Sequence, residues 1–184
     1  TLACELSNRI TAIASVTGSI FNTQYGSNCH PLRRVPVMQI SGNADGTVPY
    51  AGTSSSMPID SVVKYWVTKN NCNSTPAFSN VPNTNTGDGC TAEHYVYNGG
   101  TSNSSVELYK IIGGGHTWPG SPFVVGVTNQ DFSASKEIWR FFNKYSLSSL
   151  TSIEELKASQ FKVYPNPATD HLIIKSEQLL DKVE

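Results

Sequence analysis

Short apolar runs that end at glycine or at a polar loop constrain the fold of this chain most strongly. Residues 10–18 (ITAIASVTG) close on glycine, and residues 34–41 (RVPVMQIS) run directly into GNADGTVPY. Residues 93–98 (EHYVYN) and 105–112 (SVELYKII) alternate in polarity, and the second of them runs into GGGHTWPG. Runs of this length, rich in β-branched and aromatic residues and closed by turn residues, predict strands.

Two segments between and after these strands have the periodicity of helices. Residues 61–70 (SVVKYWVTKN) and 134–145 (ASKEIWRFFNKY) repeat apolar side chains at intervals of three and four. Their expected N-caps are Asp60 or Ser61 for the first helix and Asp131 or Ser133 for the second. Strands that alternate with helices predict an α/β domain with a mostly parallel sheet and flanking helices.

The character of the chain changes near residue 146. Residues 1–145 form the expected globular domain, and residues 146–160 are a polar linker. Residues 161–184 are expected to form a short β tail, in which two strands flank a Pro-Asn-Pro turn. Residues 1–8 have the pattern of the end of a helix without an N-cap, so we expect the chain to begin inside an element.

Composition excludes two classes of protein and favours a third. A net charge of −1, with 15% charged residues, argues against nucleic acid as an obligate partner. No window approaches the roughly 18 apolar residues of a transmembrane segment. Abundant Ser, Thr, Asn and Gly, with few Lys and Glu, favour a secreted or cell-surface protein.

The four cysteines, Cys4, Cys29, Cys72 and Cys90, also suit an oxidising compartment. They allow three pairings, of which we favour Cys4–Cys29 with Cys72–Cys90, because these bridges close two short loops. The alternative is that one or more are buried free thiols, with Cys4 the first candidate. Their spacing matches no zinc motif, and nothing in the sequence predicts a metal or another cofactor.

Two polar residues follow strands in the way that catalytic residues do. In parallel sheets ligands bind at the carboxyl ends of strands, where the segments that contain Asp45 and His116 both lie. An aspartate bonded to one imidazole nitrogen leaves the other nitrogen free to take a proton from a hydroxyl nucleophile. The glycines at 113–115 would leave the ring of His116 exposed.

Each of these residues also has a simpler interpretation. Asp45 precedes Gly46, and Asp-Gly is a common turn pair. His116 could be a surface histidine and Trp118 a packing residue, while the remaining histidines are interpreted as structural or exposed. The glycine run is not a phosphate-binding loop, because it lacks the Gly-Lys-Ser/Thr ending and does not open a helix.

Four segments together resemble the secreted polyhydroxybutyrate depolymerase-like esterases, a family related to feruloyl and acetylxylan esterases. They are QISGNADGTVPYAG, VVKYWVTKNNC, VELYKIIGGGHTWPG and TNQDFSASKEIWRFF. The resemblance implies the C-terminal half of an α/β-hydrolase fold over residues 1–145. It also implies that Asp45 is the acid and His116 the base of a Ser-His-Asp triad, in the chain order of that fold. Trp118 and Tyr50 would flank the substrate.

The sequence departs from the family at two places. Ser41 stands where the family often has histidine, and no Gly-x-Ser-x-Gly motif occurs in the 184 residues. The resemblance places that nucleophile just upstream of residue 1, so we expect this chain alone to be inactive. The expected function is a fragment of a secreted serine esterase whose substrate is a polyhydroxyalkanoate, feruloyl or acetyl ester. The alternative is a non-catalytic polymer- or carbohydrate-binding module or a pseudoenzyme.

The tail also resembles a known module. The segment FKVYPNPATDHLII is similar to the opening of the type IX secretion C-terminal sorting domain. This resemblance implies that residues 161–184 are a truncated sorting domain and that the secretion machinery is a partner. It also implies a secreted or surface-attached protein.

Overall fold

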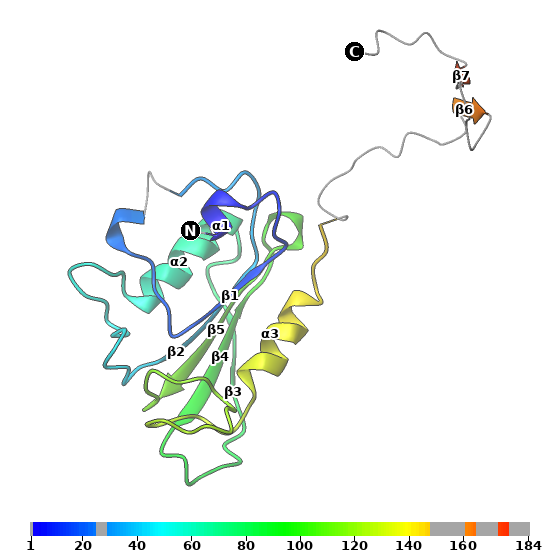
Figure 1. The fold of residues 1–184 in the computed structure, drawn as a ribbon. Coiled ribbons are helices and arrows are strands. Elements are labelled where there is room, and N and C mark those ends of the chain that lie inside the picture. Colours follow the sequence, from blue (N-terminus) through cyan, green and yellow to red (C-terminus); the bar gives the residue numbers. More distant parts are fainter. Residues whose placement is uncertain (1, 25–28, 148–160, 165–172, 177–184) are drawn as a thin grey trace. The chain divides into compact units, whose positions relative to one another are not determined.

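The computed structural model describes residues 2–24 and 29–147 and the backbone of two further strands. The chain divides into two units, Thr1–Leu150 and Thr151–Glu184. In the first unit the elements are α1 (Leu2–Glu5), β1 (Ile13–Val16), β2 (Val37–Gly42), α2 (Ile59–Asn70), β3 (Ala77–Asn80), β4 (Thr91–Tyr97), β5 (Val106–Ile112) and α3 (Ala134–Phe142) (Figure 1). Short 3₁₀ turns occupy Asn22–Gln24 and Thr101–Asn103.

The strands of this unit form one five-stranded sheet in the order β1-β2-β5-β4-β3. β1, β2 and β5 are parallel, whereas β4 is antiparallel to both β5 and β3. The α/β class is confirmed, but the sheet is mixed rather than mostly parallel. β4 and β5 are joined by residues 98–105 alone, which is too short a connection for the crossover that parallel strands need. β3 lies within residues 71–90, where no strand was predicted.

Alternation along β2 divides the core into two layers. Val37 faces the layer that contains α2, while Met38 and Ile40 face the layer that contains α3. α2 packs on β2 and β5, and α3 packs on β1 and β2, so the two helices cover opposite faces of the sheet (Figure 1). Every residue of β2 is buried, as expected for a central strand covered on both faces.

The helix boundaries differ slightly from the predicted ones. α2 begins at Ile59 with Pro58 at the N-cap, so neither Asp60 nor Ser61 is its cap. Proline suits the start of a helix because its φ is fixed and no N–H is lost from the helical hydrogen bonds. Of the two predicted caps of α3, Asp131 and Ser133, the structure has Ser133, whose hydroxyl accepts a hydrogen bond from the backbone N–H of Lys136.

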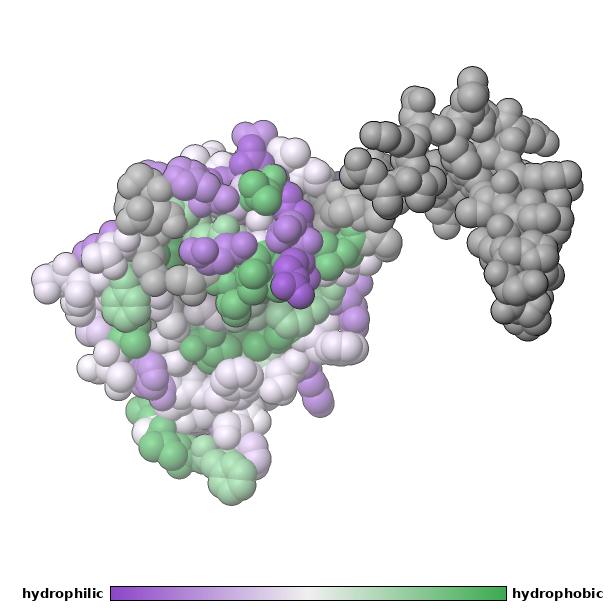
Figure 2. All heavy atoms as spheres, turned by 45° about the horizontal axis from the view of Figure 1, so that its top comes forward, coloured by the Kyte–Doolittle hydropathy of each residue, from purple (hydrophilic) through white to green (hydrophobic). Residues whose placement is uncertain are grey.

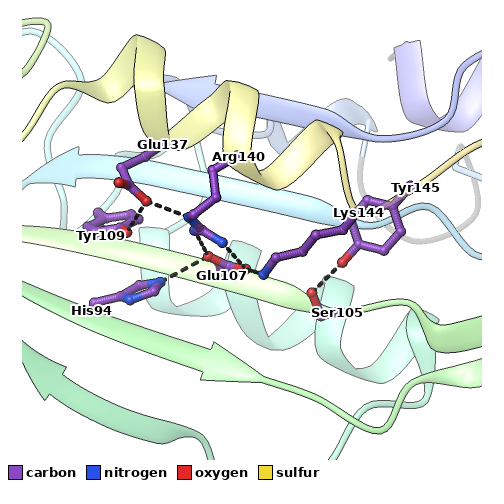
Figure 3. A network of polar contacts seen from close by, with 8 residues as sticks. All are labelled: His94, Ser105, Glu107, Tyr109, Glu137, Arg140, Lys144 and Tyr145. Carbon is purple, nitrogen blue, oxygen red and sulfur yellow. Dashed lines mark hydrogen bonds and ion pairs between the residues drawn. The ribbon is translucent and has the colours of Figure 1, made fainter.

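A buried carboxylate joins α3 to the sheet. Glu107, in the middle of β5, is fully buried. Its oxygens accept hydrogen bonds from Arg140 Nη2 at 2.5 Å and Lys144 Nζ at 2.6 Å, and one of them lies 3.0 Å from His94 Nε2 (Figure 3). Arg140 also donates to Glu137, which in turn accepts from the hydroxyl of Tyr109. The network therefore connects β4, β5 and the end of α3.

Cations around Glu107 compensate for its removal from water. Burial by itself would raise the pKa of this carboxyl group, but hydrogen bonds from His94, Arg140 and Lys144 outweigh that effect and lower the pKa to about 2. Glu107 therefore stays charged in the folded protein. Removing Arg140 or Lys144 would leave this buried carboxylate without a partner.

One predicted disulfide is confirmed and the other is wrong. Cys4 and Cys29 are bonded, with their Cα atoms 4.8 Å apart, so Cys4 is not a free thiol. Cys72 and Cys90 are free. Cys72 contacts the carbonyl of Ser104 near the end of β4, whereas Cys90 directly precedes the start of that strand. A seven-residue strand extends about 20 Å, far beyond the roughly 7 Å that a disulfide can bridge.

In the second unit, β6 (Phe161–Tyr164) and β7 (Ile173–Ser176) pair antiparallel, as predicted for the tail. The predicted Pro-Asn-Pro turn and most of the predicted linker at 146–160 lie outside the described residues. No helix in the described parts of the chain is long and apolar enough to cross a bilayer.

The Glu107 network predicts a pH dependence of stability. The pKa of this carboxyl group falls from 4.5 to about 2 on folding, so its contribution is complete above pH 4.5 and is lost as the pH falls towards 2. Glu107→Gln should remove this contribution. We expect urea unfolding at pH 7 to show a loss of about 3 kcal/mol, which shrinks as the pH approaches 2. Glu93→Gln, on the neighbouring strand, is the control. A constant difference between wild type and Glu107→Gln from pH 7 to 2 would contradict this account.

The cysteine assignment predicts two thiols. Ellman's reagent should titrate two cysteines in the unfolded, unreduced chain, since Cys72 and Cys90 are free. In the folded protein Cys90 should react slowly, because burial and the nearby Asp88 raise its pKa to about 11. Cys29→Ser should lower the free energy of unfolding by about 3 kcal/mol, and Cys72→Ser by much less. A count of four free thiols, or of none, would contradict the assignment of one disulfide, Cys4–Cys29, and two free cysteines.

Candidate functional site

The candidate site lies where β2 and β5 end. These neighbouring strands run parallel, with Val37 opposite Val106 and Gly42 opposite Ile111. The chain therefore leaves both strands at the same edge of the sheet. Asp45 lies in the loop after β2 and His116 in the loop after β5, so the topology alone brings these segments together.

Hydrogen bonds hold the two loops against each other. The backbone N–H of Asn43 donates to the carbonyl of Ile111 at 2.9 Å, and that of Ala44 to the carbonyl of Gly114 at 3.0 Å. In return, the N–H of Gly113 donates to the side-chain oxygen of Asn43 at 2.7 Å. This role of Asn43 was not predicted, although an asparagine directly after a buried strand is a signal for such a contact.

Two glycines are required by this close approach. A Cβ atom at Gly42 would lie 2.1 Å from the carbonyl oxygen of Gly114, which is shorter than any real contact. Gly113 has φ of +84°, in the left-handed region that favours glycine. The glycines therefore allow the loop to turn and the backbone to pass close to β2.

Asp45 is buried and its orientation is fixed by the backbone. Its side chain is only 1% exposed. Oδ1 accepts hydrogen bonds from the N–H groups of Thr47 and Val48, both at 2.8 Å, so the Asp-Gly turn is present. The turn and the functional interpretation of Asp45 are compatible, because the turn uses Oδ1 and leaves Oδ2 for another partner.

That partner is His116. Asp45 Oδ2 lies 2.9 Å from Nδ1 of the imidazole, whose side chain is 41% exposed. The N–H of Gly115 and the hydroxyl of Thr117 both donate to the carbonyl of Val127, so the loop is anchored on either side of the ring. Among the described residues no group bonds to Nε2. The pair thus consists of a buried acid and a half-exposed imidazole with one nitrogen available.

Trp118 and Tyr50 lie on the same two loops but have different partners. Trp118 is partly exposed, and its indole N–H donates to the hydroxyl of Ser135 at the start of α3. The hydroxyl of Tyr50 donates to Asp60 at 2.6 Å, and Lys110 Nζ lies 5.0 Å from its ring centroid. Burial and the bond to Asp60 raise the pKa of Tyr50. Trp118 has the more accessible ring of the two.

Ser41, at the position where the resembled family often has histidine, is buried at the end of β2. Gln39 donates to its hydroxyl at 2.8 Å and to the carbonyl of Gly18 at 2.7 Å. Ser41 therefore takes part in a contact between β2 and the segment after β1, and Asp45 keeps its own partners.

No metal-binding cluster accompanies this pair in the described part of the chain. Within residues 2–24 and 29–147, no group of three or more His, Cys, Asp or Glu side chains is arranged to hold a metal ion. What the geometry offers is proton transfer: an imidazole whose tautomer is set by a buried carboxylate.

Known family models do not match this chain, and no curated protein is significantly similar to it.

The contact between Gly42 and Gly114 predicts the effect of one methyl group. Gly42→Ala should push the His116 loop away from β2 and lower the free energy of unfolding by about 1–3 kcal/mol. It should also weaken the bond between Asp45 and His116, which is visible as a shift of the imidazole N–H proton in NMR spectra. Gly46→Ala is the matched control, because nothing lies within 4 Å of a Cβ atom there. Equal effects of the two substitutions would contradict the prediction.

Proposed function

We propose that this chain is the acid- and base-bearing part of a secreted serine esterase with an α/β-hydrolase fold. The observation that carries the proposal is the hydrogen bond between the buried Asp45 carboxylate and Nδ1 of the half-exposed His116. The parallel strands β2 and β5, each followed by one member of the pair, are the second support.

In the proposed reaction His116 transfers the protons. Nε2 takes the proton of a serine hydroxyl as its oxygen attacks the ester carbonyl carbon, which gives a tetrahedral intermediate. The same nitrogen then gives that proton to the leaving alcohol as the ester bond breaks. Water, deprotonated by His116 in the same way, then attacks the acyl-serine, and His116 returns the proton to the serine oxygen as the acid leaves. The exposure of the ring leaves Nε2 open to both partners.

Asp45 orients the base and stabilises its charged form. Its Oδ2 accepts a hydrogen bond from the N–H at Nδ1, which leaves the lone pair of Nε2 directed outward. The two backbone N–H groups at Oδ1 hold the carboxylate in place without help from another side chain. The imidazolium that forms during attack therefore lies against a fixed, buried negative charge.

The nucleophile in this proposal comes from outside the 184 residues. β1 has β2 on one side and no strand on the other in the described sheet, so a further strand could be added there. Beside it a cavity of about 210 Å³ is lined mainly by apolar residues of α1, β1 and α2, among them Ala3, Ile13 and Val62. In an α/β hydrolase the serine sits on a sharp turn between a strand and a helix, and the added strand would be the one that leads into this turn.

The substrate class and location follow from the same resemblance. We propose an ester of a polymer or a plant polysaccharide, with Trp118 and Tyr50 beside its acyl or aromatic part. The Cys4–Cys29 disulfide supports export to an oxidising compartment. The Tyr-Pro-Asn-Pro segment at 164–167 supports passage through the type IX secretion machinery.

Turnover measurements test the proposal. The 184-residue chain alone should not hydrolyse p-nitrophenyl butyrate, whereas a chain extended upstream through a Gly-x-Ser-x-Gly motif should. In the extended enzyme His116→Ala should lower kcat by about 10⁴- to 10⁶-fold, and Asp45→Asn by about 10⁴-fold, because the wrong tautomer is then favoured. His30→Ala, at an exposed histidine, is the control.

Two results would overturn it. Turnover by the 184-residue chain that disappears in His116→Ala would show that the nucleophile lies within it. An upstream sequence without the motif, together with an inactive extended chain, would favour a pseudoenzyme or a binding module.

A further inference from the structure

The loop that carries His116 has little hydrophobic core of its own. In residues 113–131, all of which the structure describes, the buried positions are Gly114, Pro119, Thr128 and Asn129, and none of them has a large apolar side chain. Apolar residues of this stretch are exposed instead, with Phe123 at 85% and Val125 at 78%. Figure 2 shows apolar side chains at the lower end of the molecule, towards which the parallel strands point in Figure 1. The position of the loop therefore depends on hydrogen bonds.

Residues 127–131, the backing segment, hold this loop from one side. The carbonyl of Val127 accepts hydrogen bonds from the N–H of Gly115 at 3.0 Å and from the hydroxyl of Thr117 at 3.3 Å. The carbonyl of Asn129 accepts a further bond from the loop, at 2.8 Å. Since the imidazole lies between the two residues that bond to Val127, its place depends on where the backing segment lies.

Asp131 fixes the backing segment to a distant part of the chain. Its Oδ1 accepts hydrogen bonds from the N–H groups of Thr84 and Asn85, at 2.7 and 2.9 Å. Its Oδ2 accepts one from Asn129 Nδ2 at 2.9 Å, and Asn129 is only 1% exposed. Burial by itself would raise the pKa of Asp131, but these hydrogen bonds outweigh that effect and lower it. Asp131 was an expected helix cap, and its carboxylate is used here instead.

Asp88 makes a second connection of the same kind. Its Oδ2 accepts a hydrogen bond from the N–H of Gln130 at 2.7 Å, and its Oδ1 accepts one from the N–H of Cys90 at 3.0 Å. Cys90 directly precedes β4, so this carboxylate ties the backing segment to the sheet. Hydrogen bonds to an ionised carboxylate are roughly twice as strong as those between neutral groups. Two such groups therefore set the position of a segment that lacks a core.

We propose that Asp88 and Asp131 are positioning residues for His116, because they hold the backing segment against the loop that carries the imidazole. In the described part of the chain neither carboxylate bonds to the ring, so both act through Val127. A displacement of the ring by about 1 Å would break the bond of 2.9 Å between Nδ1 and Asp45 Oδ2. The role of His116 as a base rests on the function proposed above, but the position of its ring can be measured without turnover.

The tautomer of the imidazole reports that position. Nitrogen-15 chemical shifts of the ring, measured at about pH 9 where imidazoles are neutral, give the ratio of the Nδ1–H to the Nε2–H form. Because the bond to Asp45 favours the first form, the ratio in the 184-residue chain should fall about tenfold or more in Asp131→Ala and in Asp88→Ala. Asp131→Asn can keep its bonds from Thr84 and Asn85 but not the one from Asn129, so it should show a smaller fall. This variant keeps the test available if the alanine variants fold poorly.

Glu107→Gln is the control for a purely structural role. It removes a buried carboxylate that joins α3 to the sheet and has no bond to the backing segment. This variant is expected to destabilise the fold strongly, yet its tautomer ratio should stay at the wild-type value. In the extended enzyme, Asp131→Ala should lower kcat by about 10- to 100-fold and leave KM within about twofold, since only the base is misplaced.

Two results would overturn the proposal. An unchanged tautomer ratio in all three aspartate variants would show that the carboxylates do not position the ring. An equal fall in Glu107→Gln would show that any loss of stability displaces it. A fall confined to the aspartate variants, together with an inactive extended wild-type chain, would confirm the positioning of His116 and reject the proposed function.

Discussion

The parallel pairing of β2 and β5 is the constraint on which the candidate site depends. Because their carboxyl ends meet at one edge, two loops far apart in sequence become neighbours. The final approach requires that no side chain separate them, and Gly42 meets the backbone of Gly114 there. The bond between Asp45 and His116 follows from that approach, since neither loop holds both groups.

Charged side chains surround the middle of β5 but are absent from the loop that follows it. In the middle of the strand Glu107 is buried among Arg140, Lys144 and His94, which fasten α3 to the sheet. Beyond its end, residues 113–130 contain no Asp, Glu, Lys or Arg. Moving α3 away from the sheet would leave the buried Glu107 carboxylate without its partners, which is energetically costly. The uncharged loop carries the imidazole of His116 and is hydrogen-bonded to the loop after β2.

Many elements of the fold could be predicted because their signals are local. The apolar runs and the helical periodicities were each located to within a few residues, and Ser133 was identified as a cap. The direction of β4 and the presence of β3 were not predicted, since strand direction depends on pairing partners. The predicted pairing of Cys72 with Cys90 was wrong for a related reason. The two cysteines are close in sequence, but in the fold they lie at opposite ends of β4.

The residue types alone identified the candidate acid and base, because few side chains transfer protons near neutral pH and glycine favours the turn at residue 113. Only the tertiary structure decided that Asp45 and His116 bond, that Tyr50 is engaged by Asp60, and that Phe123 faces solvent. These facts depend on distances and burial, which arise when β2 and β5 pair and the two helices cover the sheet.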